Sequence, residues 1–146
     1  MLLTQKETML LKDLKAQEEL CIKKYAKYSA GACDGELKNL FSQIGKTEQQ
    51  HFNTVSQILG ENTGQNKSGD CACKEAAATV GEQEDKYLCE DALASEKLVS
   101  SVYNTSIFEF KEVSVREALN HIQKEEQQHG EQIYSYMAAH GMYATN

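Results

Sequence analysis

The chain has 146 residues, of which 40% are apolar and 25% are charged, and its net charge is −7. This length and composition predict a single soluble domain with an ordinary core, and they exclude a membrane span. The acidic balance, without any block of Lys or Arg, argues against nucleic acid and anionic membranes as partners. Pro and Trp are absent and helix-forming residues dominate, so we predict an all-α fold.

The first fourteen residues mix four charged side chains with leucines, so they lack the continuous apolar segment of a signal peptide. The five cysteines form an odd number without regular spacing, which is typical of free thiols in a reducing compartment. We therefore expect a cytoplasmic protein.

Thr4 and Glu7 form a capping-box pattern, which predicts the start of a first helix, and Gly31 predicts its end. Its apolar stripe repeats at steps of three and four residues and comprises Leu11, Leu14, Glu18, Cys21, Tyr25 and Tyr28. One glutamate, Glu18, therefore occupies a core position.

A second helix is expected from Asp34, as its N-cap, to about Leu59, with Gly60 as its stop signal. Its stripe comprises Leu37, Phe41, Ile44, Glu48, His51, Val55 and Ile58. Here both a glutamate and a histidine occupy core positions.

Residues 60–81 hold most of the glycines and polar turn formers, which predicts a long connection. A helix of 25 residues is about 37 Å long, so a connection between two helices that run the same way must span the bundle. Short links within each helix pair and one long crossover between the pairs describe a ferritin-like four-helix bundle.

Two further capping-box patterns, Thr79 with Glu82 and Ser114 with Glu117, predict the starts of the third and fourth helices. The third stripe comprises Cys89, Ala92, Glu96, Val99, Tyr103 and Ser106. The fourth, which should end near Gly141, comprises Val115, Leu119, Ile122, Glu126, His129, Ile133 and Tyr136.

The two halves of the chain repeat each other at an offset of 78 residues. Residues 48–51 and 126–129 both read EQQH, and residues 5–59 match residues 83–137 at 13 of 55 positions. We interpret the chain as an internal duplication, with halves at about 4–60 and 79–141 packed into one domain over residues 1–146.

Six core positions carry metal-binding side chains, and the duplication relates them in pairs. They are Glu18, Glu48, His51, Glu96, Glu126 and His129. Residues three apart share a helix face, so each Glu-x-x-His pair can converge on one ion. Four unpaired carboxylates in a core would face a severe desolvation cost, which two divalent cations would cancel.

The pattern therefore predicts a dinuclear site in which Glu48 and Glu126 bridge the ions and Glu18 and Glu96 are terminal ligands. One histidine should bind each ion, and these ligand types suit iron or manganese, with zinc as a further candidate. Two alternatives stay open: the six residues lie on solvated helix surfaces, or they form a metal-free, protonated cluster.

Other side chains have less specific signals. Tyr25 and Tyr103 lie two turns after Glu18 and Glu96, either as core aromatics or as hydrogen-bond donors or redox relays behind the ligands. The loop cysteines Cys71 and Cys73 are either free thiols without a special role or a site for a metal or an intermolecular disulfide. We expect Cys21 and Cys89 to pack in the core, and His121 and His140 to face solvent.

With the six ligands placed, the chain resembles the ferritin-like superfamily, which includes rubrerythrins, bacterioferritins and manganese catalases. Residues 101–107 (SVYNTSI), 122–129 (IQKEEQQH) and 136–143 (YMAAHGMY) are similar to the coat F domain of spore coat proteins from endospore-forming Firmicutes. Rubredoxin-like Cys-x-x-Cys pairs and a fifth helix are absent, so neither an attached electron donor nor a ferritin cage is expected.

The resemblance implies deposition on the spore coat, with a homodimer and other coat proteins as partners. One hypothesis is an oxidoreductase of peroxidase, catalase or ferroxidase type that acts on peroxide, dioxygen or ferrous iron. The other is a structural coat component in which any metal only stabilises the bundle.

Overall fold

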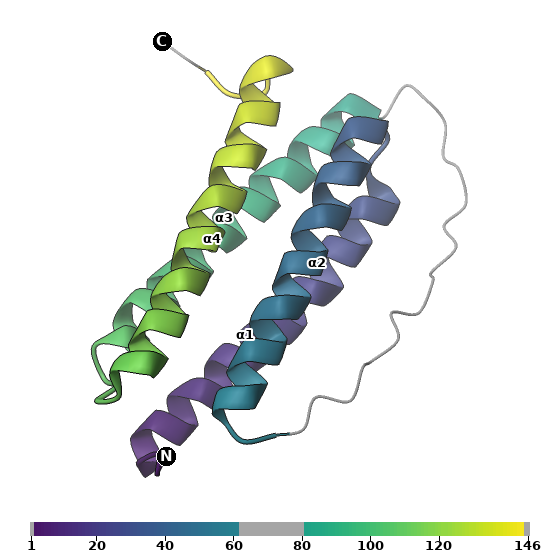
Figure 1. The fold of residues 1–146 in the computed structure, drawn as a ribbon. Coiled ribbons are helices and arrows are strands. Elements are labelled where there is room, and N and C mark those ends of the chain that lie inside the picture. The colour runs from purple at the N-terminus through teal and green to yellow at the C-terminus, as the bar shows by residue number, and fades with distance from the viewer. Residues whose placement is uncertain (1, 62–80, 145–146) are drawn as a thin grey trace.

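Four long helices make up the computed structural model, which describes residues 2–61 and 81–144. They are α1 (Gln5–Gly31), α2 (Gly35–Ile58), α3 (Gly81–Ile107) and α4 (Val113–Ala139) (Figure 1). No strand occurs in these two ranges, so the all-α prediction is confirmed.

The helices pair as two antiparallel hairpins, α1 with α2 and α3 with α4. Between the hairpins, α1 packs against α3 and α2 against α4. Figure 1 shows α2 and α3 running in the same direction, so the end of α2 and the start of α3 lie at opposite ends of the bundle. The chain must therefore cross the length of the bundle between them, which confirms the predicted topology. The crossover itself lies outside the described residues except at its ends.

Capping groups fix the ends of the first hairpin as the sequence predicts. The Thr4 hydroxyl accepts a hydrogen bond from the Glu7 N–H at 3.2 Å, and the Glu7 carboxylate accepts one from the Thr4 N–H at 2.7 Å. Asp34 caps α2 by accepting from the Glu36 N–H at 3.3 Å. After α2 comes Gly60 with φ of +78°, a left-handed conformation that glycine adopts without strain.

The prediction that Ser114 and Glu117 form a capping box is wrong, because α4 begins at Val113 and Ser114 lies inside the helix. Its N-cap, Glu112, makes no side-chain capping bond. The side chain of Arg116 instead folds back and donates to the carbonyls of residues 110 and 111 at 2.8 and 2.7 Å. Phe110, buried at 3% exposure, anchors this turn in the core, so tertiary packing sets the start of α4. Thr79, which was expected to cap α3, lies outside the described residues.

A buried acid near the start of each hairpin holds the turn of the other hairpin. Asp85 on α3 accepts from the N–H groups of Cys33 and Asp34 at 2.7 and 3.0 Å, between α1 and α2. Glu7 on α1 accepts from the Lys111 N–H at 3.1 Å, between α3 and α4. The 78-residue offset relates Glu7 to Asp85 and Cys33 to Lys111, so the two contacts are equivalent.

Two apolar clusters fill the bundle, one toward each end. The first contains Tyr25, Tyr28, Leu37, Phe41, Ile44, Cys89, Ala92, Ile133 and Met137. The second contains Leu11, Leu14, Cys21, Val55, Val99, Tyr103, Leu119 and Ile122. On α2, α3 and α4, the predicted ligands lie between the residues of the first cluster and those of the second, whereas Glu18 on α1 lies between Leu14 and Cys21 of the second cluster. A polar layer therefore crosses the middle of an apolar core, and Cys21 and Cys89 pack in that core as expected.

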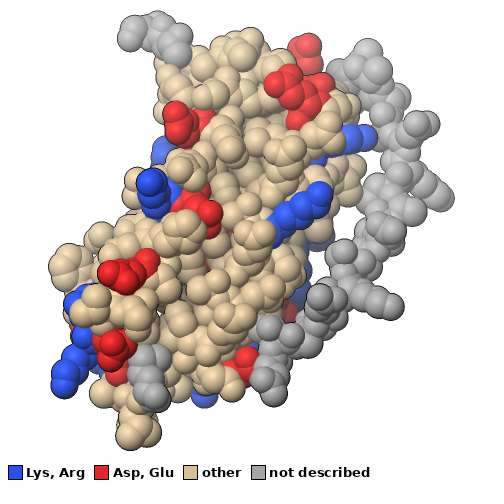
Figure 2. Space-filling model, viewed as in Figure 1, with Lys and Arg blue, Asp and Glu red and all other residues tan. Residues whose placement is uncertain are grey.

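None of α1 to α4 combines the length and the apolar composition that crossing a bilayer requires. On the face drawn in Figure 2, acidic and basic side chains are interspersed.

Candidate metal centre

The polar layer contains the six side chains singled out from the sequence, and the structure brings all of them together. None of the six residues is more than 4% exposed. They are Glu18 on α1, Glu48 and His51 on α2, Glu96 on α3, and Glu126 and His129 on α4. The alternative in which they lie on solvated helix surfaces is therefore wrong.

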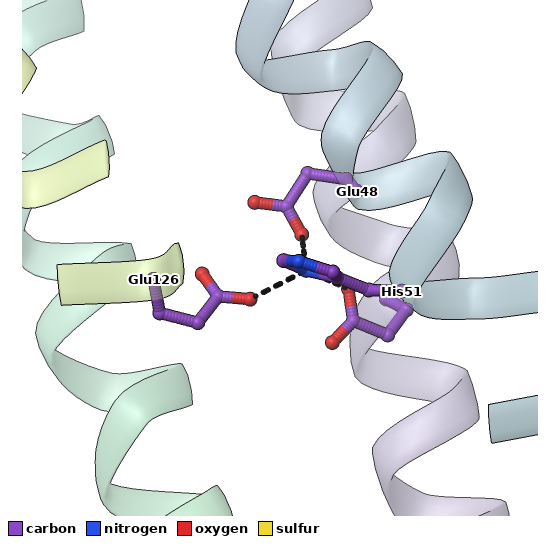
Figure 3. Close-up of side chains that lie close together, drawn as sticks. Glu48, His51 and Glu126 are labelled. Carbon is purple, nitrogen blue, oxygen red and sulfur yellow. Dashed lines mark hydrogen bonds and ion pairs between the residues drawn. The ribbon is translucent and has the colours of Figure 1, made fainter. Parts of the chain in front are cut away.

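Helix geometry brings each Glu-x-x-His pair to one spot, since residues three apart share a face. Figure 3 shows Glu48 and His51 projecting from α2 toward Glu126, which approaches from α4 on the other side. The site thus needs both hairpins in place.

The six side chains form two overlapping groups. Glu18, Glu48, His51 and Glu126 offer ligand atoms within 4.8 Å of one another, and so do Glu48, Glu96, Glu126 and His129. Glu48 and Glu126 belong to both groups, whereas each of the others belongs to one. This arrangement can hold metal ions at two neighbouring positions, with Glu48 and Glu126 shared between them.

The two histidine rings have equivalent surroundings in the two groups. His51 Nδ1 lies 3.1 Å from a Glu126 oxygen, 3.4 Å from Glu48 and 3.7 Å from Glu18. His129 Nδ1 lies 3.1 Å from Glu48, 3.6 Å from Glu96 and 3.7 Å from Glu126. Both rings therefore present Nδ1 to the carboxylates.

Several atoms of this layer are buried without a well-directed hydrogen bond among the described residues, although His129 Nδ1 and a Glu48 oxygen lie only 3.1 Å apart. They are one oxygen each of Glu18, Glu96 and Glu126, both oxygens of Glu48, and His129 Nδ1. Buried polar atoms without partners are costly, and here all of them are ligand types that face a common centre. These residues therefore fit a metal ion as their missing partner.

Protonation divides the four carboxyls of the metal-free cluster into two kinds. Burial raises the pKa of Glu18 to about 8 and that of Glu96 to about 9, so both hold a proton at neutral pH. Burial also acts to raise the pKa of Glu48 and Glu126, but the two histidines outweigh it and lower both values below the ordinary one. The shared carboxylates are thus the ionised pair.

Both histidines are protonated because the carboxylates around them stabilise the charged imidazolium form. Burial acts to lower the pKa of each imidazole, but the surrounding carboxylates outweigh it. They raise the pKa of His129 to about 11 and that of His51 well above its usual range. Two imidazolium ions therefore balance two carboxylates, and the metal-free layer is neutral overall.

The two predicted tyrosines donate hydrogen bonds across the bundle. The Tyr25 hydroxyl on α1 donates to Glu96 on α3, and the Tyr103 hydroxyl on α3 donates to Glu18 on α1. Both rings are almost completely buried. Each tyrosine therefore holds the carboxyl of the opposite helix, the predicted donor role, and leaves the other oxygen of that carboxyl for the centre.

One residue beside the centre gave no recognisable sequence signal. Glu125 on α4 accepts a hydrogen bond from His51, with 2.7 Å between its Oε2 and the ring Nε2. Its repeat equivalent is Thr47, so the duplication gave no reason to single it out. Only the contact between α2 and α4 makes it a neighbour of His51.

The remaining predicted residues lie elsewhere. His121 and His140 are at the surface, as expected, and His140 stacks on Tyr136 with ring centroids 4.0 Å apart. Cys71 and Cys73 lie outside the described residues, so both hypotheses for them stay open.

The fold and this layer define the class of protein: a ferritin-like bundle with a buried Glu/His cluster that can hold metal ions. A crystal structure of a two-domain protein from Anabaena variabilis, with DJ-1/ThiJ/PfpI-like and ferritin-like domains, matches with a TM-score of 0.73 and 14% identity. The match covers 96% of this chain and 38% of that one, so this chain spans well under half the length of that protein.

Residues 84–146, which include α4 and nearly all of α3, match the Coat F domain. The resemblance predicted from the sequence is therefore confirmed, for the ferritin-like fold over nearly the whole chain and for the coat F domain over its C-terminal part. None of the curated proteins compared with the chain matches it.

Proposed function

We propose that this ferritin-like protein of the spore coat binds two divalent metal ions, iron or manganese, in the Glu/His layer. With them it would carry out redox chemistry on peroxide or dioxygen, or oxidise ferrous iron. One observation carries the proposal: six buried ligand residues form two groups that share Glu48 and Glu126 and contain unpartnered ligand atoms.

The charge and the ligand types both support two divalent ions. Four ionised carboxylates carry four negative charges, which two divalent ions cancel, so the core stays neutral after the protons leave. Oxygen-rich ligation with one imidazole for each ion suits iron and manganese. Zinc accepts the same ligands but has no redox chemistry, so its presence would favour a structural role.

Two neighbouring redox-active ions can share a two-electron change, which is what the reduction of peroxide requires. The chain's own residues would supply the frame for this chemistry. Glu48 and Glu126 tie the two positions together, while the hydroxyls of Tyr25 and Tyr103 fix Glu96 and Glu18. Apolar clusters pack on both sides of the layer along the bundle.

The proposed location follows from the Coat F match. A protein made in the cytoplasm and deposited on the spore surface would meet oxidants during dormancy and germination. The homodimer and the other coat proteins expected as partners stay predictions, which size measurement in solution and co-purification from spore coats can test.

Metal analysis of the purified protein tests the site. After growth in medium supplemented with iron, manganese and zinc, we expect about two ions per chain, as the shared-ligand arrangement implies. The double variant Glu48→Ala plus Glu126→Ala should lose both. Glu19→Gln is the matched control, because Glu19 follows a predicted ligand but its side chain is 57% exposed. A wild-type protein without bound metal would favour the protonated, metal-free cluster and sink the proposal.

Peroxide consumption by the metal-loaded protein then separates the two functional classes. Turnover that disappears in the double variant and survives in the control supports the enzyme. The Coat F match favours a structural coat component as the second candidate. That candidate predicts bound metal that raises the melting temperature, because ligands of the native state stabilise it, without turnover under any reductant.

A further inference from the structure

The two histidines of the layer have different surroundings on their outer side. His51 Nε2 is bonded to Glu125 at 2.7 Å. His129 Nε2 has no hydrogen-bond partner in residues 2–61 and 81–144, and the ring borders a polar hollow of about 150 Å³. Gln43, Thr47 and Gln132 line this hollow, and Glu125 also borders it. Among the described residues, Glu125 thus bonds to His51 and makes no hydrogen bond to His129, whose outer nitrogen faces the hollow.

Among the equivalent positions that differ between the two halves, one pair bears directly on the carboxylate behind the histidine. The offset of 78 residues places Thr47 where the other half has Glu125, while all six clustered residues are identical between the halves. The Thr47 hydroxyl bonds to the Gln43 carbonyl of its own helix at 3.4 Å. His129 therefore has no counterpart of the carboxylate that holds His51.

A carboxylate behind a metal-binding histidine changes how the ring binds an ion. It accepts the proton of the outer nitrogen, which fixes the tautomer with the inner nitrogen free, and it raises the basicity of the ring. Removing such a partner commonly weakens metal binding by about 10-fold to 100-fold. In this chain Nδ1 faces the carboxylates and Nε2 faces Glu125, as that arrangement requires.

We propose that Glu125 is a positioning residue that makes the two metal positions unequal. The position at Glu18 and His51 binds its ion first and tightly, whereas the position at Glu96 and His129 loads second and exchanges its ion through the hollow. This inference rests on the proposed function, because it assigns different roles to the two halves of the same centre.

Titration of the metal-free, full-length protein with Co²⁺ alone, followed by visible absorption and calorimetry, tests the proposal. The wild type should show two dissociation constants that differ by about 10-fold to 100-fold. Glu125→Thr should weaken the tighter one by a similar factor and bring the two together. Thr47→Glu should also make the two dissociation constants more similar, in this case by strengthening binding at the weaker position.

Two further variants control for side effects. Glu125→Gln keeps the size of the side chain and should also weaken the tighter position, so it replaces Glu125→Thr if that variant does not fold. His121→Gln is the matched control: its Nε2 lies 3.4 Å from the other Glu125 oxygen, but its side chain is 70% exposed and lies outside the cluster. It should leave both constants unchanged.

The outcomes distinguish this inference from the proposed function. If no Co²⁺ binds to the wild type, both fail. If the wild type binds two ions with equal dissociation constants, only the inequality assigned to Glu125 is overturned. The same holds if the two constants differ in the wild type and still differ by the same factor in Glu125→Thr and Glu125→Gln.

Discussion

Loading the metal-free protein with two divalent ions should release about four protons near pH 7. In the metal-free layer, Glu18, Glu96 and His129 have pKa values of about 8, 9 and 11, and the pKa of His51 is also raised far above its usual range. All four groups therefore hold a proton. A metal ligand must be an ionised carboxylate or a neutral imidazole, so each group loses that proton when the ions bind.

The same count sets the pH dependence of binding. Each proton contributes about 1.36 kcal/mol for every pH unit, so four of them contribute about 5.4 kcal/mol to the binding of the two ions together. Between about pH 6 and pH 7.5, the product of the two binding constants should therefore rise about 10,000-fold for each pH unit.

Calorimetric titration in buffers of equal pH and different ionisation enthalpy measures the released protons directly. The slope of the apparent enthalpy against the buffer enthalpy should be about four for the wild type and about three for Glu18→Gln, which has no proton to release there. Glu19→Gln, with its exposed side chain, should keep the wild-type slope. A slope near zero, or equal slopes for Glu18→Gln and the wild type, would refute the protonation scheme.

Four further predictions concern the metal-free protein, and chemical denaturation checks each. The raised pKa values of Glu18 and Glu96 mean that the folded state holds protons which the unfolded state loses above about pH 4.5. Their stabilising contribution is complete below that pH, so the free energy of unfolding should fall as pH rises from about 5 to about 9, and a rise would contradict the sign. Tyr103→Phe removes the donor to Glu18 and should cost about 1–3 kcal/mol, with an unchanged midpoint counting against that bond. Asp85→Ala leaves two N–H groups of the α1–α2 turn unpaired and should lower the free energy of unfolding by about 1–3 kcal/mol. Leu119 is fully buried, so Leu119→Ala should lower it by about 2–5 kcal/mol.

The helices and the six clustered residues could be predicted because they depend on local periodicity and on the duplication. A stripe at steps of three and four residues sets which side of a helix is buried, and this held for Glu18 and Glu96 as it did for the leucines. The repeat then related the two halves, so a ligand found in one half predicted its equivalent in the other.

What could not be predicted depends on contacts between helices. Tyr25 reaches Glu96 rather than a ligand of its own helix because α1 and α3 pack side by side, which no periodicity within α1 encodes. Glu125 is adjacent to the centre only through the packing of α4 on α2, and the start of α4 follows the burial of Phe110. These features require the tertiary arrangement of the bundle.

The reciprocal contacts of Glu7 and Asp85 bear on how such a chain could arise. Each hairpin supplies the acid that completes the turn of the other, and each group of four ligand residues takes three from one hairpin and one from the other. A half-length hairpin would therefore reach this architecture only by pairing with a second copy of itself, and both copies would change together. Within one polypeptide that constraint is absent, so a carboxylate at position 125 does not require one at position 47, and the two halves of the bundle can take separate tasks.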